Sequence, residues 1–272
     1  MTATPPATAN GRKTLFVTGG ASGIGLAAAR HFTARGWFVG LADINTAGLR
    51  DALAAIGPDN GVTVQLDVRD RAAWDAALET FATAAGDRLD VLLNNAGIAS
   101  FGWFEEVAAS DADRMIDVNI KGVVNGAYAG LPLLARTPGS RLVNVASCAG
   151  IYGAPKLAVY SATKFAVRGL SEALDVEFAR HGVGVRCVMP WFVDTPILQA
   201  GSQGSNEVMR DRIREGGLPV YTTDEAAQVI WDAAHGAELH YTVGKRAKQL
   251  RFAARFFPGA VRKQMKASTS AF

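Results

Sequence analysis

Cysteine and long apolar runs are both scarce in this sequence. Its 272 residues include two cysteines, Cys148 and Cys187, too few for a disulfide framework. The first residues, MTATPPATANGRK, lack the apolar core of a secretory signal. No apolar run reaches the roughly 20 residues that span a bilayer, and the best candidate, GVVNGAYAGLPLLA, contains Asn125 and Pro132. We therefore expect a cytoplasmic protein without a membrane-spanning segment, and we expect no bound metal.

Acidic residues are missing from the C-terminal end of the chain. Residues 239–272 hold eight of the 28 Lys and Arg and none of the 25 Asp and Glu, so the net charge of +3 combines an acidic body with a basic tail. A helical projection places a small apolar face opposite a basic one: Ala247, Leu250, Ala254 and Phe257 against Lys248, Arg251 and Arg255. Peripheral contact with an anionic membrane is one interpretation. We favour packing on the protein itself or on a neighbouring subunit. Nucleic acid is not expected as a partner because no reader motif accompanies the basic cluster.

Strand-like runs alternate with helix-length segments along the rest of the chain. Hydrophobic residues make up 49% of the sequence, which is typical of a globular protein with one large core. Apolar strands separated by helices are typical of a parallel sheet covered on both faces. The pattern predicts a single-domain, doubly wound α/β fold with the strands TLFVT, WFVGLAD, VTVQLDV, LDVLLNN, SRLVNVAS, GVRCVMP and LHYTV. Helices are expected to begin near Gly23, Asn45, Asp70, Ser110, Pro155 and Thr223.

The sequence predicts a division of the chain into three segments. Residues 1–12 form a Pro- and Thr-rich leader that we expect to be disordered. Residues 13–244 form the α/β domain, and residues 245–272 form a basic amphipathic extension. Within the domain, the Gly/Ser-rich segment at about 196–221 interrupts the alternation. Long insertions of this kind are typically lids or binding loops, so we expect this one to contact a substrate.

A glycine-rich turn, TGGASGIG, follows the first strand and precedes an Ala-rich helix. Its glycines let the backbone turn tightly and approach a pyrophosphate, which the helix N-terminus stabilises. The spacing is G-x3-G-x-G rather than the usual G-x-G-x-x-G, and such a turn alone could be purely structural. The candidate cofactor contacts here are Gly19, Ser22, Gly23, Ile24 and Gly25.

A carboxylate at the end of the second strand supports a dinucleotide site. Asp43 lies at about the twenty-residue offset where a carboxylate accepts hydrogen bonds from an adenosine ribose. Its alternative role is a helix N-cap. The carboxylate would repel a 2′-phosphate, and neither Ser22 nor Ile44 supplies a cation. The sequence therefore predicts NAD rather than NADP.

Two further strand ends are expected to meet the same crevice, since the carboxyl ends of parallel strands share one edge of a sheet. Asp67 and Val68 close the third strand and could contact the adenine, although Asp67 could equally be a solvated strand-end residue. The NNAG turn after the fourth strand would let a cofactor lie close. Its candidate contacts are Asn94, Ala96 and Gly97.

A phenol and an amine lie one helical turn apart in AVYSATKFAV, at Tyr160 and Lys164. A free tyrosine, with a pKa near 10, is a poor base at neutral pH, and a neighbouring ammonium favours the phenolate. Ser147, at the end of the fifth strand, could hold a substrate oxygen. Asn119, in DVNIKG, could hold a water or order a proton path.

These motifs, in this order, resemble the short-chain dehydrogenase/reductase family over about residues 13–196. The resemblance rests on TGGASGIG, NNAG, Asn119, Ser147 and YSATK, with the tyrosine thirteen positions after the serine. It implies a Rossmann-type fold and hydride transfer between a nicotinamide and a carbinol or carbonyl carbon. By position, Tyr160 would be the general acid/base, Ser147 the stabiliser of the substrate oxygen, and Lys164 both a modulator of the tyrosine pKa and a ligand of the nicotinamide ribose. Asn119 would complete a proton relay.

The sequence departs from the family pattern after the sixth strand, where PWFVDTP replaces a common Pro-Gly. Pro190 is kept and Trp191 stands in the glycine position, while Val193 and Thr195 match residues that hold the nicotinamide carboxamide. Bulky side chains surround the expected site, namely those of SFGWF at 100–104, Ile151, Tyr152, Trp191 and Phe192. They favour an apolar or aromatic secondary alcohol or ketone over a sugar, unless they pack into the core or an interface.

Three functions remain open from the sequence. The leading one is an NAD-dependent alcohol dehydrogenase or carbonyl reductase. A non-catalytic NAD-binding or scaffold protein is the alternative, since fold alone does not establish activity; the intact Asn119, Ser147, Tyr160 and Lys164 weigh against it. An epimerase or dehydratase relative would need a larger C-terminal substrate domain. The family also implies a homo-dimer or homo-tetramer.

Overall fold

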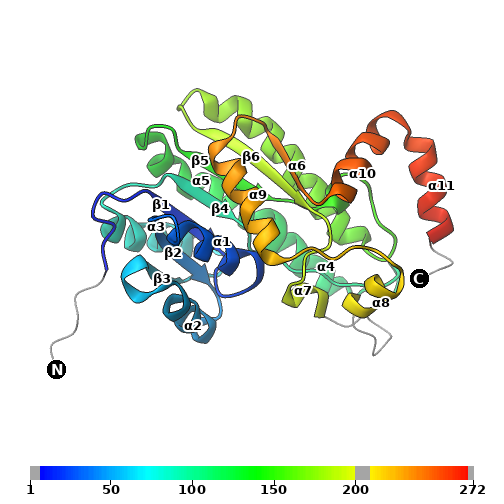
Figure 1. Ribbon diagram of the computed structural model, residues 1–272, viewed down its shortest axis with the longest axis horizontal. Helices are drawn as coiled ribbons and strands as arrows, with labels where there is room; N and C mark the ends of the chain where they lie inside the picture. Colours follow the sequence, from blue (N-terminus) through cyan, green and yellow to red (C-terminus); the bar gives the residue numbers. More distant parts are fainter. Residues whose placement is uncertain (1–6, 200–208, 269–272) are drawn as a thin grey trace.

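The computed structural model describes residues 7–199 and 209–268, and its centre is a seven-stranded parallel sheet. The strand order is β3-β2-β1-β4-β5-β6-β7, so the chain winds outward from β1 in one direction and then from β4 in the other (Figure 1). This is the doubly wound arrangement predicted from the sequence. The strands are β1 (Thr14–Thr18), β2 (Phe38–Asp43), β3 (Gly61–Gln65), β4 (Val91–Asn94), β5 (Arg141–Val145), β6 (Gly184–Pro190) and β7 (His240–Val243).

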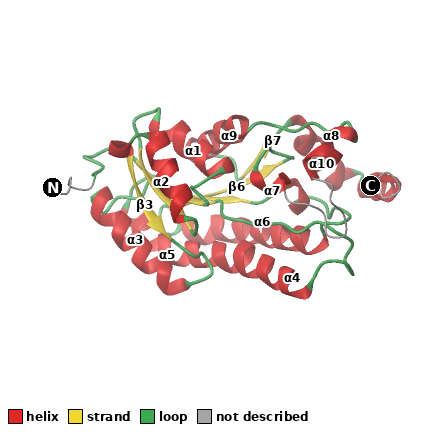
Figure 2. Cartoon of the chain, turned by 90° about the horizontal axis from the view of Figure 1, so that it is seen from below, coloured by secondary structure: helices red, strands yellow, loops and turns green. Residues whose placement is uncertain are grey.

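Helices cover both faces of the sheet, as Figure 2 shows. One face packs α1, α2 and α9 against side chains such as Leu15 and Val17, and the other packs α3, α5 and α6 against Phe16. Neighbouring residues of β1 point to opposite faces because side chains alternate along a strand. The helices are α1 (Gly23–Thr33), α2 (Thr46–Ile56), α3 (Arg71–Ala85), α4 (Ala109–Ile116), α5 (Gly122–Arg136), α6 (Ala158–Ala179), α7 (Pro196–Gln199), α8 (Met209–Glu215), α9 (Thr223–His235), α10 (Lys245–Phe256) and α11 (Pro258–Ser268).

Side-chain caps fix where several helices begin. Asn45 accepts a hydrogen bond from Gly48 N at the start of α2, and Asp70 accepts from Ala72 N at the start of α3. Thr222 and Glu225 form a reciprocal capping box on α9. Each cap satisfies N–H groups that have no partner within the helix. These positions agree with the helix starts expected near Asn45, Asp70 and Thr223.

The second half of the predicted N-terminal leader is ordered against the domain. Residues 1–6 lie outside the described part of the chain, but residues 7–12 pack on the domain. Ala9 is buried and its N–H donates to Ala84 O at 2.8 Å. The Arg12 guanidinium lies over the Phe38 ring, 5.2 Å from its centroid, and donates to Asn60 Oδ1 at 3.0 Å. The prediction of disorder is therefore wrong for residues 7–12, because the small Ala9 and the long Arg12 stem both find buried partners.

Candidate active site

A cavity of about 880 Å³ opens where the carboxyl ends of the strands meet. Its walls come from the turns after β1, β2, β3, β4, β5 and β6, together with the start of α6. Most of the residues predicted for the site line it: Gly19, Ser22, Gly23, Ile24, Asp43, Asp67, Val68, Ala96, Gly97, Ser147, Tyr160, Lys164, Pro190, Val193 and Thr195. Three predicted residues, Gly25, Asn94 and Asn119, do not line the cavity.

The glycine-rich turn forms one end of the cavity. Gly19 and Gly23 have φ of +67° and +53°, values that residues with a Cβ rarely adopt. A Cβ at Gly25 would overlap the carbonyl of Gly19, so a glycine here lets the start of α1 pack directly against the turn after β1. Ser22 precedes α1 without a side-chain cap, which leaves N–H groups of the first turn available at the cavity wall. This arrangement fits an anionic pyrophosphate.

Asp43 presents a carboxylate beside that turn. Its Oδ2 accepts from Ala21 N at 3.2 Å, and its Oδ1 accepts from Asn45 N at 3.0 Å. The helix that follows is capped by Asn45, so the N-cap role considered for Asp43 belongs to its neighbour. Asp43 therefore ties the turn after β1 to the end of β2 while lining the cavity, a position that fits a ribose.

Arg69 is a cavity residue that the sequence reasoning missed. Its guanidinium holds both carboxylate oxygens of Asp67, with Nε–Oδ1 at 2.9 Å and Nη2–Oδ2 at 2.6 Å. This contact lowers the pKa of the Asp67 carboxyl. The two charges neutralise one another at the expected adenine end, so Arg69 brings no unbalanced cation there. The sequence held a signal for this ion pair, because Asp67 and Arg69 are two residues apart in DVR.

The turn after β4 places Asn95, rather than Asn94, at the cavity. Asn94 is buried in the sheet, where its Nδ2 donates to Asn144 Oδ1 at 2.9 Å. Asn95 lines the cavity and its Nδ2 donates to Thr18 O at 2.9 Å, which joins the ends of β1 and β4. Asn94 therefore supports the site from within the sheet.

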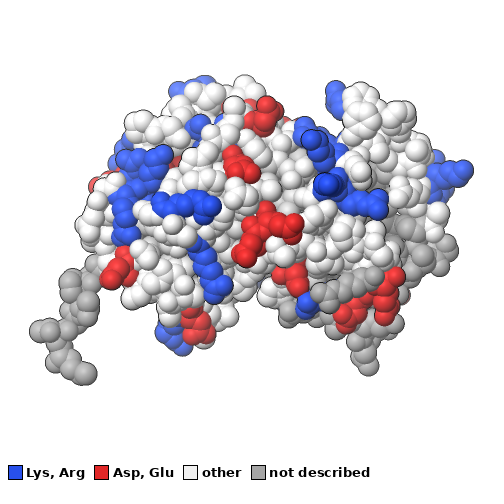
Figure 3. All heavy atoms as spheres, in the orientation of Figure 1, with Lys and Arg blue, Asp and Glu red and all other residues white. Residues whose placement is uncertain are grey.

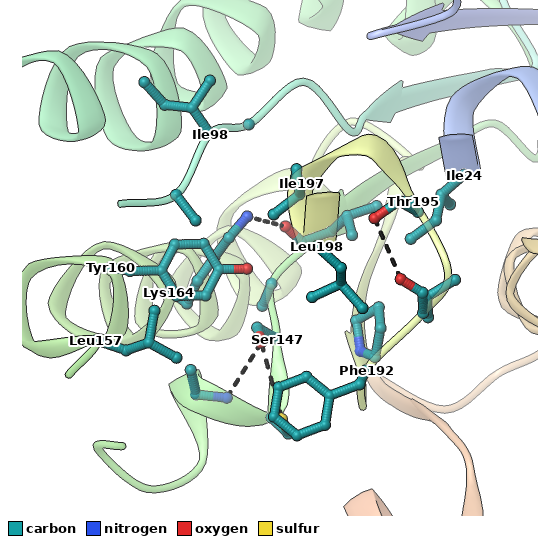
Figure 4. Close-up of a pocket in the computed structure, with 18 of the residues that line it drawn as sticks. Ile24, Ile98, Ser147, Leu157, Tyr160, Lys164, Phe192, Thr195, Ile197 and Leu198 are labelled. Atoms are coloured by element: carbon teal, nitrogen blue, oxygen red, sulfur yellow. Dashed lines mark hydrogen bonds between the residues drawn. The ribbon is translucent and has the colours of Figure 1, made fainter. Parts of the chain in front are cut away.

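Ser147, Tyr160 and Lys164 meet at the middle of the cavity (Figure 4). Ser147 begins a short 3₁₀ turn, and its Oγ accepts from Ala149 N at 3.2 Å. Tyr160 and Lys164 leave the same side of α6, and the phenol oxygen and the serine side chain face the same space. Lys164 is buried and its Nζ donates to Val145 O at 3.0 Å. That hydrogen bond directs the amine toward β5, with Nζ 5.6 Å from the Tyr160 ring centroid.

The protonation states differ from the sequence expectation. Burial raises the pKa of Tyr160 to about 12, and the nearby Ser147 hydroxyl lowers it only in part. Burial also lowers the pKa of Lys164 to about 8. The expected lowering of the phenol pKa by Lys164 is not found: burial is the largest cause of the shift, and the amine is bonded to Val145 O. At neutral pH the Tyr160 phenol is therefore protonated.

Asn119 lies behind the cavity, in a π-helical turn between α4 and α5 (Asp117–Lys121). Its Oδ1 accepts from Ile98 N at 2.9 Å, and its Nδ2 donates to Ile98 O at 2.9 Å and to Thr163 Oγ1 at 3.1 Å. The side chain thus joins the turn after β4 to α6. π-helical turns are frequent at functional sites, and this one holds the wall that carries Tyr160 and Lys164.

Comparison with known proteins decides the family. A family model described as short chain dehydrogenase matches residues 13–206.

The chain belongs to the short-chain dehydrogenase family.

Curated relatives of this short-chain dehydrogenase include two from Mycobacterium tuberculosis. A 3-alpha-(or 20-beta)-hydroxysteroid dehydrogenase is 37% identical over 185 residues, which cover 68% of this chain and 70% of that protein. The putative oxidoreductase SadH is 31% identical over 271 residues and covers 96% of both chains. Among solved structures, a short-chain dehydrogenase/reductase from Burkholderia phymatum in complex with NAD superposes with a TM-score of 0.80 at 25% identity, covering 93% of this chain and 95% of that one.

Large side chains enclose the other end of the cavity of this short-chain dehydrogenase. Of the bulky residues predicted there, Phe101, Trp103, Tyr152, Trp191 and Phe192 line the cavity. Phe104, however, is 71% exposed and Ile151 packs in the core. Four further residues, Ile197, Leu198, Ile213 and Leu218, come from the 196–221 segment that was expected to contact a substrate. Sequence reasoning missed Leu157, which precedes Tyr160, and Leu250, Gln264 and Met265 from the C-terminal extension.

Trp191 continues β6 toward β7 at the position where the family commonly has glycine. Its backbone N–H donates to Val243 O at 3.1 Å, so the backbone stays paired despite the large side chain. The indole packs edge-on against Phe192, with ring centroids 5.4 Å apart. Val193 and Thr195 remain at the cavity wall, and Thr195 Oγ1 donates to Val193 O at 3.2 Å. Trp191 therefore adds an indole to the cavity wall while its backbone N–H stays paired with the neighbouring strand.

Segments outside the core close this end of the dehydrogenase cavity. The described parts of the predicted 196–221 loop form α7 and α8, which contribute Leu198 and Ile213; residues 200–208 lie outside the described part. The extension forms α10 and α11, whose Leu250 and Met265 also line the cavity. Within the described residues, no helix is both long and apolar enough to cross a membrane.

Proposed function

We propose that this short-chain dehydrogenase interconverts a bulky apolar secondary alcohol and the corresponding ketone, with NAD as its cofactor. One observation carries the proposal. A continuous cavity runs from the glycine-rich turn and Asp43, past Ser147, Tyr160 and Lys164, to a wall of aromatic and aliphatic side chains. A dinucleotide site at one end, an acid/base group in the middle and an apolar compartment at the other end are what such a reaction requires.

Bound NAD would supply the hydride acceptor for oxidation, or the hydride donor for reduction as NADH. Ser147 Oγ would hold the substrate oxygen by a hydrogen bond beside the phenol. Tyr160 would take the hydroxyl proton of an alcohol, or give its own proton to a ketone oxygen. Because the phenol pKa is raised to about 12, the phenol holds at neutral pH the proton that reduction of a ketone would use. Asn119 would act by positioning, through Ile98 and Thr163.

The preference for NAD rests on the charge of Asp43. A 2′-phosphate beside this carboxylate would be repelled, and the nearby Arg69 is neutralised by Asp67. Gly97 leaves room beside the cavity, since a Cβ there would lie 3.2 Å from Asn119 Oδ1 and 3.4 Å from Lys164 Nζ. Lys164 lines the same part of the cavity and would bind a ribose hydroxyl. The NAD named for the Burkholderia structure is consistent with this assignment.

The substrate class rests on the cavity wall. Phe101, Trp103, Phe192 and Leu198 are apolar, and a hydrocarbon ring system would displace water from them. The relative named as a hydroxysteroid dehydrogenase acts on a substrate of that character. We favour an alicyclic or aromatic alcohol over a sugar. The non-catalytic alternative has no specific observation in its favour, and the predicted homo-oligomer stays a prediction.

A substrate panel tests the proposal. Purified protein would be offered aliphatic, aromatic and steroid-like secondary alcohols with NAD or NADP, and reduced-nicotinamide absorbance would be followed. We expect oxidation with NAD and the highest kcat/KM for the bulky ring-containing alcohols. Failure of every alcohol, and of every matching ketone with NADH, would contradict the enzymatic proposal.

A further inference from the structure

An exposed aromatic cluster consists of Phe252 and Phe256, on the outer face of α10, and Phe257, the residue that follows this helix. These side chains are 60%, 59% and 57% exposed. The Phe252 ring centroid lies 4.8 Å from that of Phe256 and 6.2 Å from that of Phe257, so the three form one patch. Contiguous exposed apolar patches of this kind mark interaction surfaces.

Packing of α10 on its own domain does not account for this cluster. The inward face of the helix consists of Ala247, which is fully buried, with Leu250 and Ala254 against the core beneath them. At 100° per residue, Phe252 lies on the opposite side of the helix. The face that sequence analysis identified as apolar is thus used inside the protein, apart from Phe257, and a second apolar surface remains on the outside.

Cations frame the aromatic cluster. Lys245, Lys248 and Arg255 lie seven, four and three residues from Phe252, so helical periodicity places them on the same outer face. All three are exposed. Residues 239–272 contain no Asp or Glu to balance them. Figure 3 shows the blue side chains gathered over α10 and α11 at the right of the molecule.

The helices α10 and α11 also border the apolar end of the cavity. Leu250 from α10, and Gln264 and Met265 from α11, contribute to the cavity wall. A shallow second hollow lies between the loop before α6 and α11, where Tyr152 and Pro155 face Arg262. The aromatic and basic face therefore lies on the element that closes the apolar compartment.

We propose that α10 docks this protein on an anionic lipid surface. Phe252, Phe256 and Phe257 enter the boundary between headgroups and acyl chains, while Lys248 and Arg255 lie among the lipid phosphates. A second copy of the chain fits less well. A two-fold interface would bring this cationic face against itself, with no carboxylate from residues 239–272 to neutralise it. With the proposed function, this docking brings the cavity to alcohols or ketones dissolved in the bilayer.

Vesicle co-sedimentation of the full chain, without NAD or substrate, tests the docking. Vesicles of phosphatidylcholine alone are compared with vesicles that also contain phosphatidylglycerol. We expect binding only to the anionic vesicles, and its loss near 1 M salt, where the Debye length falls to about 3 Å. The variant K248Q/R255Q should bind about 25-fold more weakly, because each cation near an anionic surface contributes about fivefold.

Matched variants separate the aromatic patch from general surface hydrophobicity. F252S/F256S should lose at least tenfold in vesicle affinity, whereas F104S, which removes a 71% exposed phenylalanine elsewhere, should bind like the wild type. Circular dichroism confirms that each variant is folded. Equal binding to both vesicle types, absence of binding, or a change of oligomeric state in F252S/F256S without vesicle binding would overturn the proposal.

This test is independent of the enzymatic proposal. Vesicle binding is measured without turnover, so a protein that binds vesicles but oxidises no alcohol would contradict only the proposed function. In an active protein, F252S/F256S should oxidise a water-soluble alcohol at the wild-type rate and lose activity only toward an alcohol carried in anionic vesicles. Equal loss on both substrates would show that the two side chains act on the cavity itself, and would contradict the docking role.

Discussion

The protonation of Tyr160 and Lys164 depends on the surroundings of each side chain as well as on its residue type. Their spacing on α6 predicts that they act together, and the structure places both at the cavity wall. The hydrogen bond from Lys164 to Val145 O comes from a strand distant in sequence, and no local pattern announces it. Burial of both groups explains why the pKa of the phenol is raised and why that of the amine is lowered.

The lowered pKa of Lys164 predicts a pH dependence. With a pKa of about 8 the amine is charged below that pH and neutral above it, while Tyr160 keeps its proton up to about pH 12. For ketone reduction, kcat/KM should therefore be level below pH 8 and fall above it, because this ratio reports the groups of the free enzyme. Initial rates of ketone reduction, measured from pH 6 to pH 10 at a constant NADH concentration, would check this. A reduction rate that rises through pH 8 would contradict the assignment.

The charge of Asp43 can be tested without changing its shape. Asp43→Asn keeps one of the two oxygens that accept from Ala21 N and Asn45 N, and it removes the charge that would repel a 2′-phosphate. We expect the ratio of kcat/KM for NADP to that for NAD to rise about tenfold, since removing a close like charge is worth at least 1.4 kcal/mol. Steady-state kinetics with each cofactor give this ratio. An unchanged ratio would mean that Asp43 does not select the cofactor.

At the scale of elements, the sequence predicts the strands and helix starts well and the ends of strands less well. β1 and β6 have the predicted bounds, because apolar runs between turn residues leave little freedom. At the end of β4, a shift of one residue decides whether a side chain faces the cavity or the sheet interior. Asn94 was predicted to contact the cofactor, and its neighbour Asn95 occupies the cavity wall instead.

Two glycines in helices provide a matched test of packing. A Cβ at Gly126 in α5 would lie 2.7 Å from the Trp74 ring and overlap the Asn94 amide, whereas a Cβ at Gly169 in α6 meets nothing within 4 Å. Gly126→Ala should lower the free energy of unfolding by about 1–3 kcal/mol through overpacking. Gly169→Ala should raise it by about 0.5–1 kcal/mol, because alanine is the better helix former. Urea unfolding of both variants measures the difference, and equal effects would refute this account of α5.

For the molecule as a whole, the cavity is built from segments that sequence patterns do not connect. The turns after the strands were predicted to meet because parallel strands end at one edge. By contrast, Ile213, Leu250 and Met265 reach the cavity from α8, α10 and α11 across long chain separations. The extension also divides its apolar residues between an inner face, which packs, and an outer cluster around Phe252, which stays exposed. Only the folded structure shows which apolar residues of the extension pack inside and which stay exposed.

Cofactor binding should stabilise the whole molecule. A ligand present at about 100 times its Kd adds about 2.7 kcal/mol to the free energy of unfolding, which raises the Tm of a protein of this size by several degrees. NAD should produce this shift in a thermal melt, and NADP at the same concentration should produce a smaller one because of Asp43. A larger shift with NADP would contradict the cofactor assignment.

The proposed role of Tyr160 is tested most directly by Tyr160→Phe, which removes one oxygen from the cavity wall. We expect this variant to bind NAD with nearly the wild-type affinity, measured by calorimetry, and to have a kcat at least a hundredfold lower in both directions, because it has no proton to give or take. Turnover at the wild-type rate, with NAD bound normally, would show that Tyr160 is not the acid/base.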